Sequence, residues 1–118
     1  MSTAPYPPAD QPLIPMPALT PNALRDAVRR LVPSREGEFR AELEQASTWA
    51  VEQSSLTPLR LFTIKWGTVV AIERIASRAA RFHDLEYRTS TASTPDEARA
   101  ISAELRAILL EAEREITA

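Results

Sequence analysis

The sequence predicts an all-α protein, a bundle of four to five helices behind an extended proline-rich N-terminal arm. The first observation is a set of three threonine–proline pairs, each before an apolar run with helical spacing: Thr20-Pro21, Thr57-Pro58 and Thr94-Pro95. Threonine at the N-cap accepts a hydrogen bond from a free backbone N–H, and proline at the first helical position lacks only an N–H that would be unpaired. The second observation is that seven of the ten prolines lie within the first 21 residues. We therefore assign residues 1–19 to the arm and residues 20–118 to one helical domain.

A segment so rich in proline forms neither a helix nor an interior strand, and is expected to be extended. We expect residues 1–12 to be a tail. Residues 13–19 are different, because Leu13, Ile14 and Met16 make them apolar enough to lie along a groove of this domain or of a partner. We favour docking on the chain's own domain.

The first two predicted helices are short and amphipathic. The first runs from Thr20 to about Leu31 and places one apolar residue per turn on one face: Leu24, Val28 and Leu31. Pro33-Ser34 ends it and caps the second, whose apolar stripe has spacings of four, three and four: Phe39, Leu43, Ala46 and Ala50. Trp49 lies about 80° from that stripe, so we expect it to flank the core rather than to hold a ligand.

The third predicted helix, from Thr57, is apolar on two sides and is therefore expected to be central. One side carries Leu59, Phe62, Trp66, Val69 and Val70, and the other carries Leu61, Ile64, Thr68, Ile72 and Ile75. We expect Phe62 and Trp66 to be buried against the second and last helices. Gly67 costs about 1 kcal/mol in mid-helix relative to alanine, which indicates close approach of another helix. The pattern leaves open whether this helix continues or breaks near Ser77.

The last predicted helix has the strongest start signal, a capping box in Thr94-Pro95-Asp96-Glu97. Apolar residues follow at a spacing close to the 3.5 residues of helix bundles: Ala98, Ile101, Leu105, Ile108, Ala112 and Ile116. We expect this helix to reach nearly to the C-terminus and to lie antiparallel to a neighbour.

The composition gives no support for an enzyme. The chain has no cysteine, which excludes disulfides, thiolate metal sites and cysteine nucleophiles. His83 is the single histidine, and only Glu86 lies at a helical spacing that could orient it. Most paired acids stand two residues apart and diverge on a helix, and two glycines cannot build a phosphate loop. We therefore expect no catalytic, metal or cofactor site.

The same reading predicts a soluble protein in the cytoplasm. Neither a basic segment followed by an apolar run nor about 18 consecutive apolar residues is found.

Charge is unevenly distributed along the chain, although the net charge is only −2. Residues 55–94 carry six bases against three acids, whereas residues 34–54 and 95–118 each have a net charge of −3. Arg74, Arg78 and Arg81 recur at i, i+4 and i+7, which places three guanidinium groups on one stripe. Such a stripe suits carboxylates or phosphates. We favour pairing with the acidic helices of the same chain; contact with a protein partner and binding of nucleic acid are the alternatives.

Three stretches of the chain carry helix caps and apolar positions that are also found in other proteins: Pro15 to Arg25, Val32 to Glu42 and Leu56 to Ile72. Together they resemble a family of short uncharacterised actinobacterial proteins, over about residues 13–85. Some members look like the small partner of toxin–antitoxin gene pairs, so the resemblance implies an antitoxin-like binder. Members often carry an Asp-Pro break near the position of Ile75-Ala76, which this sequence lacks. The family has no catalytic motif to carry over.

The sequence therefore predicts a non-enzymatic helical module that binds another protein, with an antitoxin-like or regulatory role. The alternative is a nucleic-acid-binding regulator that uses the basic stripe. A homo-oligomer is compatible with either, and no membrane or cofactor is implied. The candidate partner-binding residues are Arg74, Arg78, Arg81, Leu13, Ile14 and Met16.

Overall fold

The computed structural model describes residues 8–117 and confirms the all-α class. Within that range the chain forms five α-helices and one 3-10 turn, with a single β-bridge and no β-strand. In chain order the elements are α1 (Pro21–Leu31), η1 (Pro33–Arg35), α2 (Glu36–Gln53), α3 (Thr57–Glu73), α4 (Ala76–Thr89) and α5 (Pro95–Thr117).

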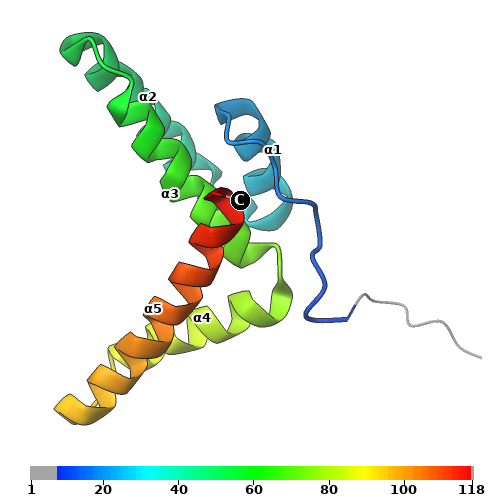
Figure 1. Cartoon of the computed structure of the whole chain (residues 1–118), viewed down its shortest axis with the longest axis vertical. Helices are drawn as coiled ribbons and strands as arrows, with labels where there is room; N and C mark the ends of the chain where they lie inside the picture. Colours follow the sequence, from blue (N-terminus) through cyan, green and yellow to red (C-terminus); the bar gives the residue numbers. More distant parts are fainter. Residues whose placement is uncertain (1–7, 118) are drawn as a thin grey trace, which may run out of the picture.

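The helices are arranged as two antiparallel hairpins that diverge from a common crossing (Figure 1). The α2–α3 hairpin and the α4–α5 hairpin meet where the second half of α3 lies against the C-terminal part of α5. The helix α1 packs beside α2 and α3, and among the described residues α2 approaches neither α4 nor α5. The hairpins therefore enclose an open angle, which we call the notch.

Two of the three predicted threonine caps are confirmed. The hydroxyl of Thr20 accepts a hydrogen bond of 3.3 Å from the N–H of Ala23, and that of Thr94 accepts one of 3.1 Å from Glu97. The prediction for Thr57 is wrong, because Thr57 is already the first residue of α3. Its N–H instead donates to the hydroxyl of Ser55, at 3.1 Å. The hydroxyl that accepts a hydrogen bond at the start of α3 is therefore that of Ser55 and not that of Thr57.

The larger core cluster lies between α1, α2 and α3. The ring of Phe39 meets Phe62 and Trp66 edge-on, with centroids 5.0 and 5.1 Å apart. Phe62 and Trp66 are buried as predicted, but their partners are residues of α1 and α2 rather than of the last helix. The last helix packs one turn further along α3, where Ala112 belongs to a second cluster with Ala71 and Ile72.

The α3 and α4 helices are separated by a break at Ile75, whose backbone is extended (φ −115°, ψ 107°). The break therefore falls two residues before Ser77. The N-terminal arm runs across this break and supplies backbone partners for it (Figure 1). The N–H of Leu13 donates to the Arg74 carbonyl at 2.7 Å, and the N–H of Ser77 donates to the Ala9 carbonyl at 2.8 Å.

These contacts confirm docking of the arm on its own domain and correct part of the tail prediction. Residues 8–12, which we expected in the tail, include Ala9 and also Pro12, which forms a single antiparallel bridge with Ile75. Residues 1–7 lie outside the described part of the chain. The arm and the helices consequently share one core, since Ile14 is buried in the larger cluster.

Gly67 is a point of close packing on α3, as its place in mid-helix predicts. A Cβ atom there would lie 2.7 Å from Leu19 Cδ2 and 3.4 Å from Ile116 Cγ2. The end of the arm and the end of α5 therefore meet on the same face of α3.

Candidate functional site

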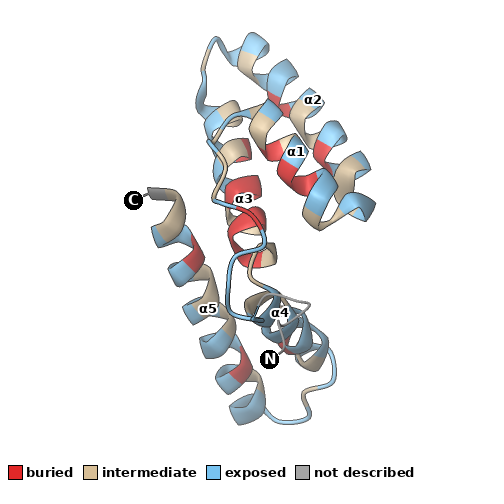
Figure 2. Cartoon of the chain, turned by 90° about the vertical axis from the view of Figure 1, so that its right-hand side faces the viewer, coloured by how far each residue is buried: buried red, intermediate tan, exposed pale blue. Residues whose placement is uncertain are grey.

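The outer part of the α2–α3 hairpin exposes the second apolar side of α3. Leu61 is 61% exposed and Ile64 47%, and Trp49 on α2 is 49% exposed. Figure 2 shows that buried residues gather around α1 and the middle of α3, whereas the outer ends of the hairpins are mostly exposed. The expectation that α3 is covered on both sides therefore holds only near the crossing with α5, where Ile72 is buried.

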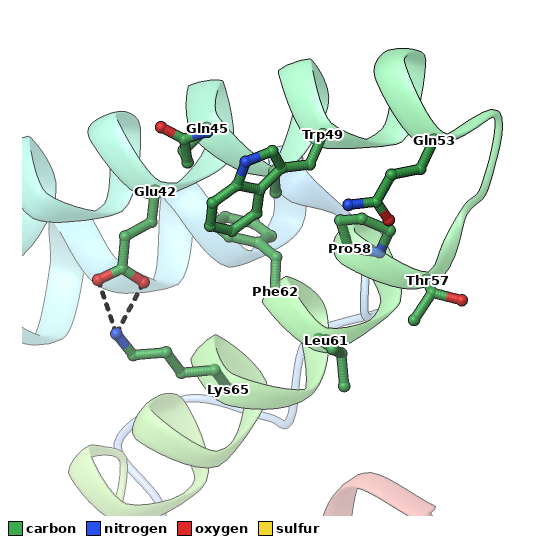
Figure 3. Close-up of a pocket in the computed structure, with 10 residues that line it drawn as sticks. Glu42, Gln45, Trp49, Gln53, Thr57, Pro58, Leu61, Phe62 and Lys65 are labelled. Atoms are coloured by element: carbon green, nitrogen blue, oxygen red, sulfur yellow. Dashed lines mark hydrogen bonds and ion pairs between the residues drawn. The ribbon is translucent and has the colours of Figure 1, made fainter.

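A groove of about 510 Å³ runs between α2 and α3 on this side (Figure 3). Trp49 projects from one wall and Leu61 from the other, while Phe62 lies between the two helices. We call this surface the hairpin groove, and its lining is Glu42, Gln45, Ala46, Trp49, Gln53, Thr57, Pro58, Leu61, Phe62 and Lys65.

The charges at one end of the hairpin groove neutralise each other. The Lys65 ammonium lies 2.7 Å from both carboxylate oxygens of Glu42, and one of these oxygens also accepts a hydrogen bond of 3.0 Å from the indole N–H of Trp66. Lys65 further lies 3.7 Å from Glu38. The Arg35 guanidinium lies 4.9 Å from the Trp66 ring centroid. The rest of the groove lining is uncharged, so the groove suits an apolar and neutral surface.

The floor of the groove continues along α3 to the base of the notch. A second hollow of about 330 Å³ begins at Lys65 and is bounded by η1, α3, α4 and α5. Residues at spacings of four, three and four therefore form one continuous stripe on α3, from Leu61 through Lys65 and Thr68 to Ile72. The base of the notch is lined by Arg35, Lys65, Thr68, Val69, Ile72, Glu73, Phe82, His83, Glu86 and Leu109.

His83 connects α4 to α3 at the base of the notch. Its Nε2 atom lies 2.5 Å from Glu73 Oε2 and its Nδ1 atom 3.1 Å from Glu86 Oε1. Ionised carboxylates only accept hydrogen bonds, so an imidazolium with two N–H groups satisfies both contacts. Burial lowers the pKa of His83, but the hydrogen bonds and charges of Glu73 and Glu86 outweigh it, so this pKa is raised.

The ion pair of His83 with Glu73 joins α4 to α3, and we call this pair together with Glu86 the His83 clasp. The sequence pointed to Glu86 but missed Glu73, because Glu73 lies on another helix and only the fold brings it to the ring. Among the residues that the structure describes, no three histidine or carboxylate groups could hold a metal ion.

The predicted arginine stripe pairs with the acidic last helix, which is the option that the charge pattern favours. Arg74 lies 2.7 Å from Glu115, and Arg78 lies 2.6 Å from the other oxygen of the same carboxylate. Arg81 pairs with Glu104. The side chains of Arg74 and Arg78 are only 12% and 11% exposed. The hydrogen bond from Arg78 lowers the pKa of Glu115.

The three candidate residues of the arm lie in different surroundings. Ile14 is buried, Met16 packs between the two core clusters, and Leu13 is exposed. The Ile14 carbonyl also accepts a hydrogen bond of 3.3 Å from the Arg74 guanidinium. Ile14, Met16 and Arg74 thus contribute to one structural junction, and Leu13 alone faces solvent.

The residues that sequence reasoning missed are Trp49, Leu61 and Ile64. For Leu61 and Ile64 the signal was the second apolar side of the third predicted helix, which we assigned to the core, whereas Trp49 was expected to flank the core rather than to hold a ligand. No helix in the described range is long and apolar enough to cross a membrane. Comparisons with models of protein families, with curated proteins and with solved structures give no match.

Proposed function

We propose that this protein is a non-enzymatic helical module that binds protein helices through the hairpin groove. The single observation that carries the proposal is the exposure of Trp49, Leu61 and Ile64 around a groove whose charges are already paired. Apolar side chains gathered around a groove mark interaction sites, and amphipathic helices bind such grooves through residues at i, i+3, i+4 and i+7.

The binding surface fits a regulatory or neutralising role in the cytoplasm, in which the module covers a helix of its target. An antitoxin-like role is the form of this proposal that the family resemblance favours. The alternative of a nucleic-acid-binding regulator is less favoured, because the guanidinium groups of Arg74, Arg78 and Arg81 pair with carboxylates of the chain itself. Phosphate binding would have to compete with these pairs.

A pull-down from the native cell with tagged full-length protein tests the proposal. Leu61→Glu places a charge in the groove at an exposed position, so the helical content measured by circular dichroism should be unchanged. Tyr87→Glu is the matched control, because Tyr87 is exposed on α4 and lines no hollow described above. We expect the wild type and Tyr87→Glu to retain the same proteins and Leu61→Glu to lose them. Equal capture by all three would refute the proposal.

A further inference from the structure

We infer that the hairpin groove is occupied by a second copy of this chain, so that the α2–α3 hairpin of each copy lies in the notch of the other. This inference names the partner of the site proposed above and rests on that proposal. The dimer has twofold symmetry, in which each copy presents the same surface to the other.

The chemistry of the groove is compatible with self-association. Near a twofold axis each side chain meets its own copy, so a lone charge there would be repelled. Gln45 and Gln53 carry amides that both donate and accept hydrogen bonds, and can therefore pair with themselves. Trp49 and Leu61 pack equally well against copies of themselves. Lys65 and Glu42 are neutralised within each chain.

The shape of the monomer leaves room for this arrangement. The hairpins diverge (Figure 1), and the stripe on α3 leads from the hairpin groove to the base of the notch. The tip of the hairpin is apolar on its other side as well, where Val51 and Leu56 are exposed. On α5 the notch offers Leu109 at its base, and a hollow that adjoins Leu109 on this helix is also lined by Leu105 and the exposed Leu110. A hairpin inserted there is covered on both sides.

Charge at the hairpin tip agrees with this placement. The Arg60 side chain has no ion-pair partner within the described range. In an interlocked dimer the tip of one copy reaches the base of the other notch. The base carries Glu86, whose half-exposed carboxylate contacts His83 through Oε1, so Arg60 can pair with its other oxygen.

The available face is large enough for a specific interface. A hairpin of about 17 residues is about 25 Å long and about 20 Å wide, which gives roughly 500 Å² of face per copy. Two such faces reach the total of about 1,000 Å² that a specific interface requires, before the notch walls are counted.

Sedimentation and cysteine cross-linking of the purified full chain test the inference. Between about 1 and about 100 µM we expect the wild type and Tyr87→Glu to reach twice the chain mass of 13.1 kDa and Leu61→Glu to remain a monomer. The chain contains no cysteine. Leu61→Cys should therefore form a covalent dimer with copper phenanthroline as oxidant, because a residue near the axis meets its copy, whereas Tyr87→Cys should not.

The outcomes separate this inference from the function proposed above. A wild type that is monomeric at about 100 µM overturns the inference. If Leu61→Glu still loses the captured proteins in that case, the groove binds a different protein and the proposed function stands. A dimer that Leu61→Glu does not dissociate, or that fails to cross-link through Leu61→Cys, also overturns the inference, because the copies then meet through another face. If the wild type is a monomer and Leu61→Glu captures the same proteins as the wild type, both the dimer and the proposed function of the hairpin groove are refuted.

Discussion

One carboxylate oxygen of Glu42 accepts a hydrogen bond of 3.0 Å from the indole N–H of Trp66. The Trp66 side chain is fully buried in the cluster of α1, α2 and α3. A buried N–H without a partner is costly, so Glu42 links the neutral end of the hairpin groove to the core.

Removing this acceptor should destabilise the domain. We expect Glu42→Ala to lower the free energy of unfolding by about 1–3 kcal/mol, because the indole N–H loses its partner. Glu42→Gln keeps an acceptor and should cost less. Lys65→Met removes the exposed ion pairs with Glu42 and Glu38 and a cation–π contact with Trp66 but leaves the acceptor of the indole N–H, and should cost about 0–1 kcal/mol. Urea denaturation of the three variants measures the difference, and equal losses for Glu42→Ala and Lys65→Met would contradict the role of Trp66.

Truncation of the buried Phe62 should have a larger effect than truncation of the exposed residues around the groove. Phe62 is buried against Phe39, so Phe62→Ala leaves a cavity and should cost about 3–5 kcal/mol. Leu61→Ala, at the exposed neighbouring position, serves as the control and should cost less than about 1 kcal/mol. Similar midpoints for the two variants in thermal unfolding would show that the aromatic cluster is not the core.

Stability should depend on pH through His83. The pKa of His83 is raised, so its contribution is complete below the ordinary value of about 6.5 and is lost as the pH rises through the folded-state value. We expect the melting temperature to fall as the pH rises from about 6 to about 8, and His83→Gln to flatten this dependence. An NMR titration of the ring should give a pKa above that of a free histidine. If the melting temperatures of the wild type and His83→Gln change with pH in the same way, His83 does not stabilise the fold through Glu73 and Glu86.

The partly buried ion pairs of the arginine stripe should contribute more to stability than the exposed one. Arg78→Ala leaves Glu115 without its closest cation and should cost about 1–3 kcal/mol. Arg81→Ala removes a pair that is about half exposed and should cost no more than about 1 kcal/mol.

The same pair should weaken in acid. Because the pKa of Glu115 is lowered, its contribution is present above the ordinary value of about 4.5 and is lost as the pH falls through the folded-state value. Urea unfolding at neutral and acidic pH therefore should show a smaller effect of Arg78→Ala in acid. A fully stable Arg78→Ala variant that no longer binds its partner would make the stripe the functional surface.

The arm should contribute to the stability of the domain, and its buried residue Ile14 tests this contribution. Ile14→Ala removes a buried side chain from the larger cluster and should cost about 2–4 kcal/mol. Leu13→Ala, at the exposed adjacent position, should change stability by less than about 0.5 kcal/mol. Equal unfolding midpoints for these two variants would mean that the arm is a passive extension.

Local signals predicted the helices well, because caps and apolar spacing act within a few residues. The starts at Thr20 and Thr94 are of this kind. The close packing at Gly67 involves the distant residues Leu19 and Ile116, and only the cost of a glycine in mid-helix indicated it. The break at Ile75 was not located, since its extended backbone is stabilised by an arm about sixty residues away. No Asp-Pro pair is needed for the break.

The candidate site was predicted less well than the fold. The second apolar side of α3 was visible in the sequence, but whether another helix covers it depends on the angle between the hairpins. That angle is set by the crossing of α3 and α5 and by the arm, which are contacts between distant segments. Leu61 therefore reads as a core residue in the sequence and proves to be a surface residue in the fold.

The order of synthesis gives the N-terminal arm a further consequence. A ribosome makes Ala9, Leu13 and Ile14 before their hydrogen-bond partners at Ser77 and Arg74, so the arm cannot form these bonds until the end of α3 and the start of α4 have emerged. Its docking should therefore be a late event in folding. A chain truncated before Arg74 would keep the apolar partners of Ile14 but would lose every hydrogen bond that ties the arm to the break between α3 and α4.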